Sequence, residues 1–371
     1  MKLSKILAIV LALVMVFALV ACKSGTETKT EEPAKAAVKV AMITDYGDIT
    51  DQSFNQTTYE ACKAFCEGKK LDFQYYKPAS DSDEDRISSI EKAIDDGFNT
   101  IVMPGYAFGP AIKATAEKNA DVKFIALDVS EFDLGYEGAI PANLYSAVYQ
   151  EELCGYMAGY AAVKLGFLGG MAVPAVVRYG YGFVQGVDAA AAELGLTDVA
   201  VKYAYGNQFY GDADITAAMD VWYGADTEVV FACGGGIFTS AGESAKKYGK
   251  KVIGVDVDQA GTIDGLYGEG ITVTSAMKGL AATVNTMLGK VVAGNFEGGK
   301  VETLGLVSAV PEENYVQIAG STQFSDSFTK DDYKALVGKM YKGEVSVSND
   351  TTKNAADFAT VITVDDQGNI K

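Results

Sequence analysis

The sequence predicts an α/β protein with two Rossmann-like lobes, each built on a parallel, doubly wound sheet. Short apolar segments with strand character alternate with amphipathic segments of helical period, and the connections are short. This alternation restarts near the middle of the chain, after a segment rich in alanine and glycine. Residues 38–371 are also too many for one hydrophobic core and suit two domains.

The first lobe begins with the apolar strand Val38–Ile43, which ends in a polar loop. The helix predicted next, Ser53–Glu67, carries an apolar stripe, and the helix Asp83–Gly97 has isoleucines at helical spacing and ends at a glycine. The other elements predicted here are the strands Leu71–Tyr76, Thr100–Met103 and Val122–Leu127 and the helix Phe108–Asn119. Strands that alternate with helices in this way form a parallel sheet.

The second lobe is predicted to begin with a long helix, Tyr145–Leu165. The alternation then resumes with strands at 167–171, 199–205, 228–232 and 251–255 and helices at 182–194, 212–224 and 238–248. The segment Ile271–Lys290 is a strand that runs into a helix and could return to the first lobe, which would give a hinge of several crossing strands. Residues 345–371 are polar and strand-prone, and the pattern assigns them no place.

The N-terminal region indicates export. Lys2 and Lys5 precede the sixteen apolar residues Ile6–Ala21, which as a helix would span about 24 Å, short of the roughly 30 Å of a bilayer core. A signal peptide is therefore predicted. The run ends in Leu-Val-Ala before Cys22, which resembles a bacterial lipobox and predicts acylation of Cys22; an ordinary signal with a chance cysteine is the alternative. The polar residues 23–37 then form a flexible tether.

The expected organisation follows from these segments. It comprises a signal peptide at 1–21, the acylated cysteine and tether at 22–37, a first lobe at 38–144 plus about 276–305, a second lobe at 145–275 plus about 306–345, and an unplaced segment at 346–371. We expect the protein to be exported and anchored by lipid to the outer face of the cell membrane, or to the periplasmic side of a bacterial envelope.

Composition excludes several kinds of function. The chain has no histidine, which removes Ser-His-Asp and Cys-His catalysis and ordinary imidazole metal sites. Its net charge of −18 repels nucleic acid and anionic lipid, so we expect no nucleic-acid partner and contact with the membrane only through the anchor. Cys62 and Cys66 lie four apart on a predicted helix, with Cβ atoms about 5–6 Å apart. A disulfide needs about 3.8 Å, so these are predicted to be free thiols.

The loops at the carboxyl ends of the predicted strands carry the candidate site, because ligands of open α/β sheets bind there. The first loop places Phe54 at the mouth of a helix, where its flat face could stack on a planar ring. Either Asp51 or Ser53 could cap that helix. Asp128, Asp256 and Lys278 end later strands; singly they suit caps or solvated charges, but together they suit a hydroxylated ligand.

A glycine-rich turn follows another predicted strand. Residues 233–236, Cys-Gly-Gly-Gly, lack the lysine of a P-loop and the spacing of a dinucleotide motif, so no cofactor is expected. Close approach of backbone to a ligand and a plain tight turn are both consistent with this segment.

Four segments together resemble the basic membrane protein family. They are Asp-Tyr-Gly-Asp-Ile-Thr-Asp-Gln-Ser-Phe-Asn at 45–55, Gly-Gly-Met at 169–171 with Pro174, Gly-Val-Asp-Val-Asp-Gln at 254–259, and Thr-Ser-Ala-Met-Lys at 274–278. The resemblance spans about residues 38–320. It implies a lipid-anchored receptor of type I periplasmic-binding fold, which delivers purine nucleosides to the permease subunits of an ABC importer and is not an enzyme.

The resemblance also implies a set of site residues. Asp256 and Lys278 would hold the ribose hydroxyls, and Phe54 would stack on the base, with either Phe209 or Tyr179 on its other face. The cleft residues implied are Asp45, Phe54, Asn55, Asp128, Phe209, Gly234, Asp256 and Lys278, with Tyr179 as the competing ring. Ala172 and Ile237 depart from the family pattern, and this leaves the base specificity open.

Three other functions compete with this interpretation. A sugar or signalling-molecule receptor of the same fold would keep the aspartates without needing two stacking rings. A surface adhesin or immunogen would leave the cleft residues unexplained. An enzyme would need a nucleophile–base pair or a metal cluster, and the sequence offers no such constellation.

Overall fold

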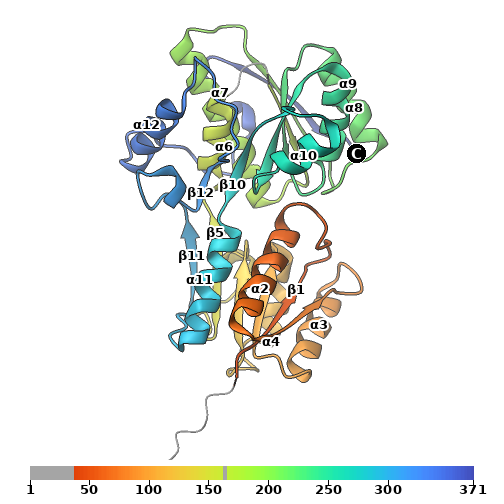
Figure 1. Cartoon of the computed structure of the whole chain (residues 1–371), viewed down its shortest axis with the longest axis vertical. Helices are drawn as coiled ribbons and strands as arrows, with labels where there is room; N and C mark the ends of the chain where they lie inside the picture. Colours follow the sequence, from red (N-terminus) through yellow and green to blue (C-terminus); the bar gives the residue numbers. More distant parts are fainter. Residues whose placement is uncertain (1–36, 162–164) are drawn as a thin grey trace, which may run out of the picture. The chain divides into compact units, whose positions relative to one another are not determined.

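The computed structural model describes residues 37–161 and 165–371. The predicted signal peptide, Cys22 and nearly all of the tether lie outside the described residues. Residues Val38–Lys371 form one compact unit, which contains two α/β lobes (Figure 1). None of the helices in the described ranges is long and apolar enough to cross a membrane.

The first lobe is built on a parallel sheet with strand order β11-β5-β4-β3-β1-β2. Its strands are β1 Lys39–Ile43, β2 Asp72–Tyr76, β3 Thr100–Pro104, β4 Lys123–Leu127, β5 Leu144–Tyr149 and β11 Lys300–Leu304. Its helices are α2 Phe54–Lys69, α3 Asp83–Asp95, α4 Gly109–Thr115, α5 Glu131–Leu134 and α11 Leu280–Ala293, with a 3₁₀ helix at Tyr106–Phe108. The central strands β1, β3 and β4 are buried along nearly their whole length, as the apolar segments predict.

The second lobe has the strand order β12-β10-β9-β8-β6-β7-β13, and all neighbours are parallel except β12 and β10. Its strands are β6 Leu165–Gly169, β7 Ala200–Tyr205, β8 Val229–Cys233, β9 Lys251–Asp256, β10 Thr272–Lys278, β12 Val316–Ile318 and β13 Thr363–Asn369. Its helices are α6 Glu151–Tyr160, α7 Pro174–Leu194, α8 Ala213–Gly224, α9 Phe238–Tyr248, α10 Ala260–Tyr267 and α12 Lys330–Tyr341, with 3₁₀ helices at Pro311–Glu313 and Ala355–Phe358. The predicted two-lobed α/β class is confirmed.

One predicted helix is wrong over its first five residues. Residues 145–149 belong to strand β5 of the first sheet, and helix α6 begins only at Glu151. A short apolar run that is buried in a parallel sheet has no period that distinguishes it from a buried helix. The chain therefore enters the second lobe after Tyr149. It returns after Lys278, because all of β10 pairs within the second sheet.

Two helix boundaries also differ from the prediction. Helix α7 begins at Pro174 rather than at Gly182, because proline suits the first turn of a helix. The predicted helix Phe108–Asn119 is instead a 3₁₀ turn followed by the short helix α4.

Backbone contact joins helices α6 and α7. A Cβ atom on Gly155 would lie 2.2 Å from the carbonyl oxygen of Tyr179, and one on Gly182 would lie 2.0 Å from that of Glu152. These glycines let the helices approach more closely than side chains would allow. The approach brings the N-terminal turns of α6 and α7 to the junction of the lobes, where the candidate site lies.

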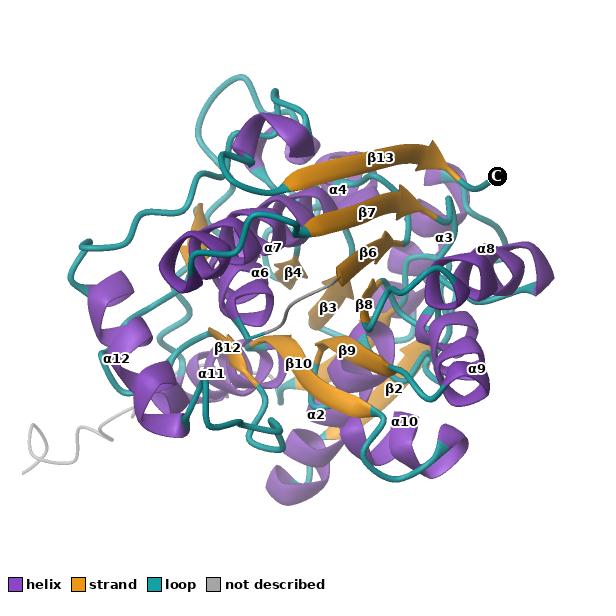
Figure 2. Ribbon diagram, turned by 90° about the horizontal axis from the view of Figure 1, so that it is seen from above, coloured by secondary structure: helices purple, strands orange, loops and turns teal. Residues whose placement is uncertain are grey.

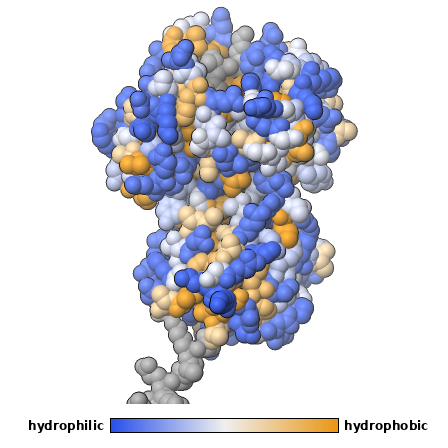
Figure 3. Space-filling model, in the orientation of Figure 1, coloured by the Kyte–Doolittle hydropathy of each residue, from blue (hydrophilic) through white to orange (hydrophobic). Residues whose placement is uncertain are grey.

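The segment that the sequence left unplaced extends the second sheet. Strand β13 pairs in parallel with β7, and the two lie side by side in Figure 2. Cys62, Cys66, Cys154 and Cys233 are buried free thiols. Large exposed apolar side chains such as Phe132 and Val221 are scattered, and the face in Figure 3 is mostly hydrophilic with small apolar groups.

Candidate ligand-binding site

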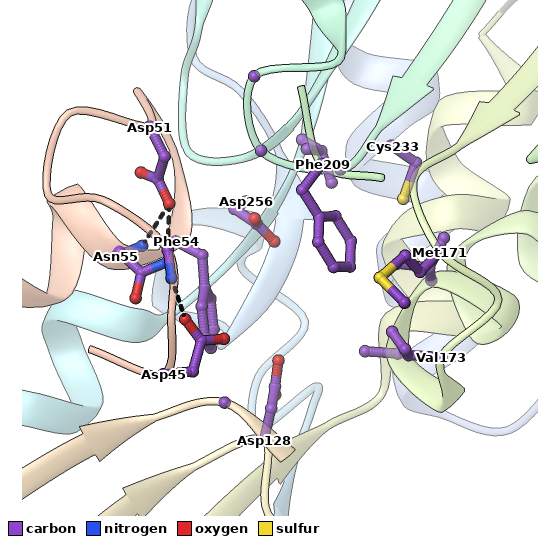
Figure 4. A pocket seen from close by; sticks show the side chains of 18 of the residues that line it. Asp45, Asp51, Phe54, Asn55, Asp128, Met171, Val173, Phe209, Cys233 and Asp256 are labelled. Carbon is purple, nitrogen blue, oxygen red and sulfur yellow. Dashed lines mark hydrogen bonds between the residues drawn. The ribbon is translucent and has the colours of Figure 1, made fainter. Parts of the chain in front are cut away.

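A cavity of about 760 Å³ lies between the two lobes, at the carboxyl ends of strands from both sheets. This volume is within the range of small-molecule sites. The cavity lining includes every described residue that the sequence and the resemblance singled out: Asp45, Phe54, Asn55, Asp128, Tyr179, Phe209, Gly234, Asp256 and Lys278. Figure 4 shows several of these side chains around the cavity.

Two carboxylates, those of Asp45 and Asp51, accept hydrogen bonds from backbone N–H groups of the loop after β1. Asp45 accepts hydrogen bonds from the backbone N–H groups of Tyr46 and Gly47, at 2.7 and 2.8 Å. Burial raises the pKa of Asp45, while these two hydrogen bonds lower it. A Cβ atom on Gly47 would lie 2.4 Å from Nδ2 of Asn55, so any larger residue at this position would displace the Asn55 amide.

Asp51 caps helix α2, which decides between the two caps that the sequence allowed. Its carboxylate accepts from the backbone N–H groups of Ser53, Asn55 and Gln56 at 2.8–3.0 Å, whereas Ser53 makes no side-chain cap. Asp51 also accepts from Nδ2 of Asn55 at 3.1 Å (Figure 4). Within the described residues, Oδ1 of Asn55 is buried without a hydrogen-bond partner. A bound ligand could supply the missing donor.

The two candidate stacking rings occupy different environments. Phe209 is half-buried in the loop after β7, and Figure 4 shows its ring in the cavity opposite Phe54. Tyr179 is 1% exposed, and its hydroxyl donates to Oδ1 of Asp256 at 3.3 Å. The ring of Tyr179 packs edge-on against Phe231, with centroids 5.9 Å apart. Tyr179 thus forms part of the buried wall, whereas Phe209 presents a face to the cavity.

Lys278 lies at the centre of a buried charge cluster. Its Nζ atom donates to Oδ2 of Asp128 at 2.5 Å and lies 3.5 Å from Asp256 and 3.6 Å from Glu151. Burial alone would lower the pKa of Lys278, but the neighbouring carboxylates, Asp128 foremost, raise it well above its usual value. Lys278 is therefore a permanent cation beneath the cavity, 4.7 Å from the centroid of the Phe54 ring.

Asp128 and Asp256 hold equivalent positions in the two lobes. Asp128 follows β4, which is the fourth strand of the first sheet counted from β2. Asp256 ends β9, which is the fourth strand of the second sheet counted from β7. The backbone φ angles of Asp128 and Asp256 are 59° and 64°, respectively. Aspartate adopts this left-handed conformation more readily than most residues. Burial raises the pKa of Asp128 to about 6, against the opposing effect of Lys278. Its Oδ1 atom has no hydrogen-bond partner in the described part of the chain, so it is available to a ligand hydroxyl.

Asp256 also connects the lobes. Its Oδ2 atom accepts from the hydroxyl of Ser53 at 2.7 Å, and nearby Nε2 of Gln259 donates to the carbonyl of Gln52 at 3.0 Å. These hydrogen bonds join the mouth of α2 to the end of β9, so both halves of the cavity wall are held together on this side.

The glycine turn at 234–236 serves Phe209 directly. A Cβ atom on Gly234 would lie 2.9 Å from the Cα of Gly170 and 3.0 Å from the Phe209 ring. One on Gly170 would lie 2.4 Å from the same ring. The glycines at 170 and 234 therefore leave room for the Phe209 ring. The sequence suggested either close approach of backbone to a ligand or a plain tight turn at 233–236, and neither hypothesis included this role.

Sequence reasoning missed Glu151 and Arg178. Glu151 is fully buried, and its carboxylate accepts from Nε of Arg178 at 2.7 Å. The signal was present: two adjacent glutamates in an otherwise apolar, glycine-rich segment indicate a buried charge with a partner. Over the described ranges, no group of acidic or cysteine side chains is arranged to hold a metal ion.

A two-lobed α/β unit with a cavity at the strand ends, lined by apolar surface and a few charged groups, has the architecture of a solute-binding protein. A family model described as ABC transporter substrate-binding protein, PnrA-like, matches residues 38–351. The chain belongs to this family, which confirms the resemblance seen in its motifs. The family is one of substrate-binding proteins and not of enzymes.

Two relatives and one solved structure illustrate the likeness. The chain is 27% identical over 318 residues to the ABC transporter nucleoside-binding protein BmpA of Lactococcus lactis, covering 80% of this chain and 87% of that protein. It is 28% identical over 319 residues to basic membrane protein A of Borreliella burgdorferi, covering 83% and 86%. An ABC transporter solute-binding protein from Aeropyrum pernix superposes with a TM-score of 0.66 at 19% identity, covering 86% of this chain and 90% of that one, and shows the fold alone.

Proposed function

We propose that this ABC transporter substrate-binding protein captures a purine nucleoside between its lobes and presents it to the permease. The observation that carries the proposal is the pairing of Phe54 and Phe209 on opposite sides of the cavity (Figure 4). Lys278, whose Nζ atom lies 4.7 Å from the centroid of the Phe54 ring, also lines this cavity together with its partner carboxylates. Two aromatic faces suit a planar base, and buried carboxylates beside a cation suit the hydroxyls of a sugar. A nucleoside has both parts in one molecule.

The proposed pose assigns each half of the ligand. The base lies between Phe54 and Phe209, and the buried Oδ1 of Asn55 accepts from an N–H group on its edge. The ribose lies over Asp128, Asp256 and Lys278. Phe209 is chosen over Tyr179 because the Tyr179 ring is buried in the wall. The Lactococcus relative is named a nucleoside-binding protein, which supports a nucleoside as the ligand proposed here.

The ligand is bound and released unchanged. Hydrolysis of a nucleoside needs an acid or base placed at the glycosidic bond, and the pose assigns its carboxylates, Asp128 and Asp256, to the ribose hydroxyls instead. Closure of the lobes on the ligand provides the signal to the permease, because the ligand stabilises the closed state by its higher affinity for it. No steady release of free base from inosine or adenosine is expected after repurification.

The direct test is to identify the ligand. The freshly purified protein is denatured, and the released small molecules are analysed by mass spectrometry. The refolded or dialysed protein is then titrated calorimetrically with guanosine, inosine, adenosine and ribose. We expect a purine nucleoside in the extract and much tighter binding of a nucleoside than of ribose. Ribose bound as tightly as every nucleoside would instead establish the sugar-receptor alternative.

We also propose that the protein is held to the outer face of the membrane by lipid on Cys22. The motif Leu-Val-Ala-Cys at 19–22 supports this, together with the polar tether that follows it. Replacement Cys22→Ser should release the protein from membranes or block its maturation. Unchanged partitioning into membranes and an N-terminal peptide without lipid mass would contradict the anchor.

A further inference from the structure

The loop that carries Phe209 is attached on its inner side by backbone hydrogen bonds. Residues 206–212 join β7 to α8. The N–H of Asn207 donates to the carbonyl of Gly170 at 2.9 Å, and the carbonyl of Phe209 accepts from the N–H of Gly236 at 2.8 Å. The N–H of Asp212, at the end of the loop, also donates to the hydroxyl of Ser240 on α9 at 3.0 Å.

The outer side of the same loop is contacted by residues 363–371. Strand β13 runs parallel to β7, from the pair Thr363 and Ala200 to the pair Asn369 and Tyr205. The N–H of Ile370 then donates to the carbonyl of Tyr205 at 2.8 Å. The parallel direction brings the end of β13 to the point where β7 ends and the Phe209 loop begins.

Side chains extend this contact into the loop itself. Nζ of Lys371 forms an ion pair with Asp212 and lies 3.3 Å from Oε1 of Gln208. Gln208 in turn donates to Asp212 at 2.8 Å and to the carbonyl of Tyr210 at 2.9 Å. Gln208 and Tyr210 directly precede and follow Phe209 in the chain. The network of Lys371, Gln208 and Asp212 therefore holds the loop on both sides of Phe209.

The segment is itself firmly attached to the second lobe. The carboxylate of Asp188 on α7 accepts from the backbone N–H groups of Thr360, Val361 and Ile362 at 2.7–3.2 Å. Further along, Nε1 of Trp222 donates to Oε1 of Gln367 at 2.9 Å, and Ile370 packs on the core that contains Trp222. Residues 363–371 therefore connect a rigid part of the lobe to the loop.

We propose that residues 363–371, which lie beyond the residues matched by the family model, are a positioning element for Phe209. The element holds the loop in the conformation that presents the ring to the cavity and thereby sets the affinity for the aromatic half of the ligand. Preorganisation of this kind raises affinity because less conformational freedom is lost on binding. The part that concerns affinity rests on the proposed nucleoside function.

The test compares Lys371→Met, a chain that ends after Ile362, and the control Lys334→Met. Lys334 is exposed on α12 of the same lobe, and no ion pair or hydrogen bond of its side chain is found in the described structure. Hydrogen–deuterium exchange of residues 206–212 is measured without ligand, and guanosine and ribose are titrated calorimetrically. We expect faster exchange of the loop and guanosine affinity about twofold to fivefold weaker in Lys371→Met, with ribose affinity unchanged. The shortened chain should lose about tenfold or more, approaching Phe209→Ala.

The double variant Phe209→Ala/Lys371→Met distinguishes positioning from a general structural role. If Lys371 acts through the ring, it should bind guanosine no more weakly than Phe209→Ala alone. An undiminished effect of Lys371→Met in that background, or unchanged exchange of 206–212 in Lys371→Met, would overturn the proposal. If the shortened chain does not fold, Gln208→Ala/Lys371→Met replaces it. If the wild type binds no nucleoside, the proposed nucleoside function is refuted. The positioning of the loop by residues 363–371 is still tested in that case, because hydrogen–deuterium exchange of residues 206–212 does not require a ligand.

Discussion

The two lobes use the same strand order to bring similar groups to the cavity, but they hold those groups by different means. Starting at β2 and at β7, the sheets run β2-β1-β3-β4-β5-β11 and β7-β6-β8-β9-β10-β12. Each fourth strand ends in an aspartate with left-handed backbone, Asp128 or Asp256, and Figure 4 shows a phenylalanine ring from each lobe at the cavity, Phe54 and Phe209.

The rings differ in what holds them. Phe54 is the first residue of α2, and the adjacent cap Asp51 fixes it by three backbone hydrogen bonds within six residues of sequence. Phe209 lies in a loop that is contacted by residues distant in sequence, namely Gly170, Gly236, Ser240 and Lys371. The helix mouth at the first ring thus combines a local cap with the hydrogen bonds of Gln52 and Ser53 to the second lobe, whereas the loop of the second ring depends on tertiary contacts. The comparison teaches that repeated topology places the groups, while local detail decides how rigidly each is held.

The largest loss of stability is expected from replacement of Lys278, because this residue contacts carboxylates of both lobes. Lys278 belongs to the second sheet but neutralises Asp128 of the first. Lys278→Met leaves buried carboxylates without their cation and should cost about 3–5 kcal/mol of unfolding free energy at pH 8. The loss should be smaller at pH 5, because Asp128, with its pKa raised to about 6, is then mostly neutral. Urea denaturation at both pH values measures this.

The matched control for this prediction is Lys290→Met. Lys290 pairs with the exposed Glu297, and loss of such a pair should change stability by about 0–1 kcal/mol. If the two lysine variants destabilise equally, Lys278 does not act as the shared cation of the cluster.

The second prediction tests whether the Phe209 ring depends on remote glycines. In Gly170→Ala the new Cβ atom would lie 2.4 Å from the ring, so Phe209 must move. Guanosine affinity should fall towards the value for Phe209→Ala, which we expect to be about 5- to 150-fold below wild type, as for Phe54→Ala. Ribose affinity should hardly change in any of these variants, as calorimetric titration would show.

Gly338→Ala is the control for the glycine substitution. Gly338 lies in α12, and a Cβ atom there would meet nothing within 4 Å. Its guanosine affinity should equal that of the wild type. Wild-type affinity in Gly170→Ala would mean that the ring is not held against this turn.

A third prediction concerns the two helices that directly follow the crossings of the chain between the lobes, α6 and α11. Helix α11 begins with apolar Leu280, whereas α6, in the equivalent position, begins with the buried pair Glu151 and Glu152. Burial, with a contribution from Glu151, raises the pKa of Glu152 from 4.5 to about 7. A raised pKa means that the neutral form favours folding, so the stabilisation is complete below about pH 4.5 and is lost as the pH rises through about 7.

Glu152→Gln remains neutral at every pH and should therefore be more stable than wild type at pH 8, by about 1–3 kcal/mol. The difference should vanish near pH 4.5. Thermal or urea unfolding across this range measures it, with exposed Glu269→Gln as a control that shows no such trend. If Glu152→Gln and the wild type are equally stable at pH 8, the surroundings of Glu152 do not disfavour its charged form.

The smallest effect is expected at the cap of the first ring's helix. Asp51→Ala removes the acceptor for three backbone N–H groups and should cost about 0.5–2 kcal/mol in urea denaturation. Asp51→Ser keeps a capping oxygen and should recover part of the loss. Guanosine affinity should fall along with stability, because Phe54 and Asn55 are fixed by the same cap. If Asp51→Ala is destabilised but binds guanosine with unchanged affinity, the position of the Phe54 ring does not depend on the Asp51 cap.

Much of the candidate site was predictable, because parallel strands end at one edge of a sheet. Asp45 and Asp128 follow predicted strands of the first lobe, and Asp256 and Lys278 end predicted strands of the second, so the alternation places each pair at one edge of its sheet. That the two edges face one cavity is decided by the tertiary structure. Glu151 and Arg178 were not found. Glu151 was placed within the predicted helix 145–165, and Arg178 preceded the helix predicted at 182–194 and belonged to no predicted element. Strand β5 was taken as helix, since a buried apolar run has no diagnostic period.

By itself, the sequence determined the α/β class, the division into two lobes and the strand ends that carry the polar groups, because these depend on periodicity and on residues adjacent in the chain. Only the tertiary structure decided that Phe209 rather than Tyr179 presents a ring to the cavity, that Asp51 caps α2, and that residues 363–371 extend the second sheet beside β7. Each of these depends on which surfaces are buried and on contacts between residues far apart in sequence. Polar segments such as 363–371 carry little hydrophobic pattern from which such contacts could be inferred.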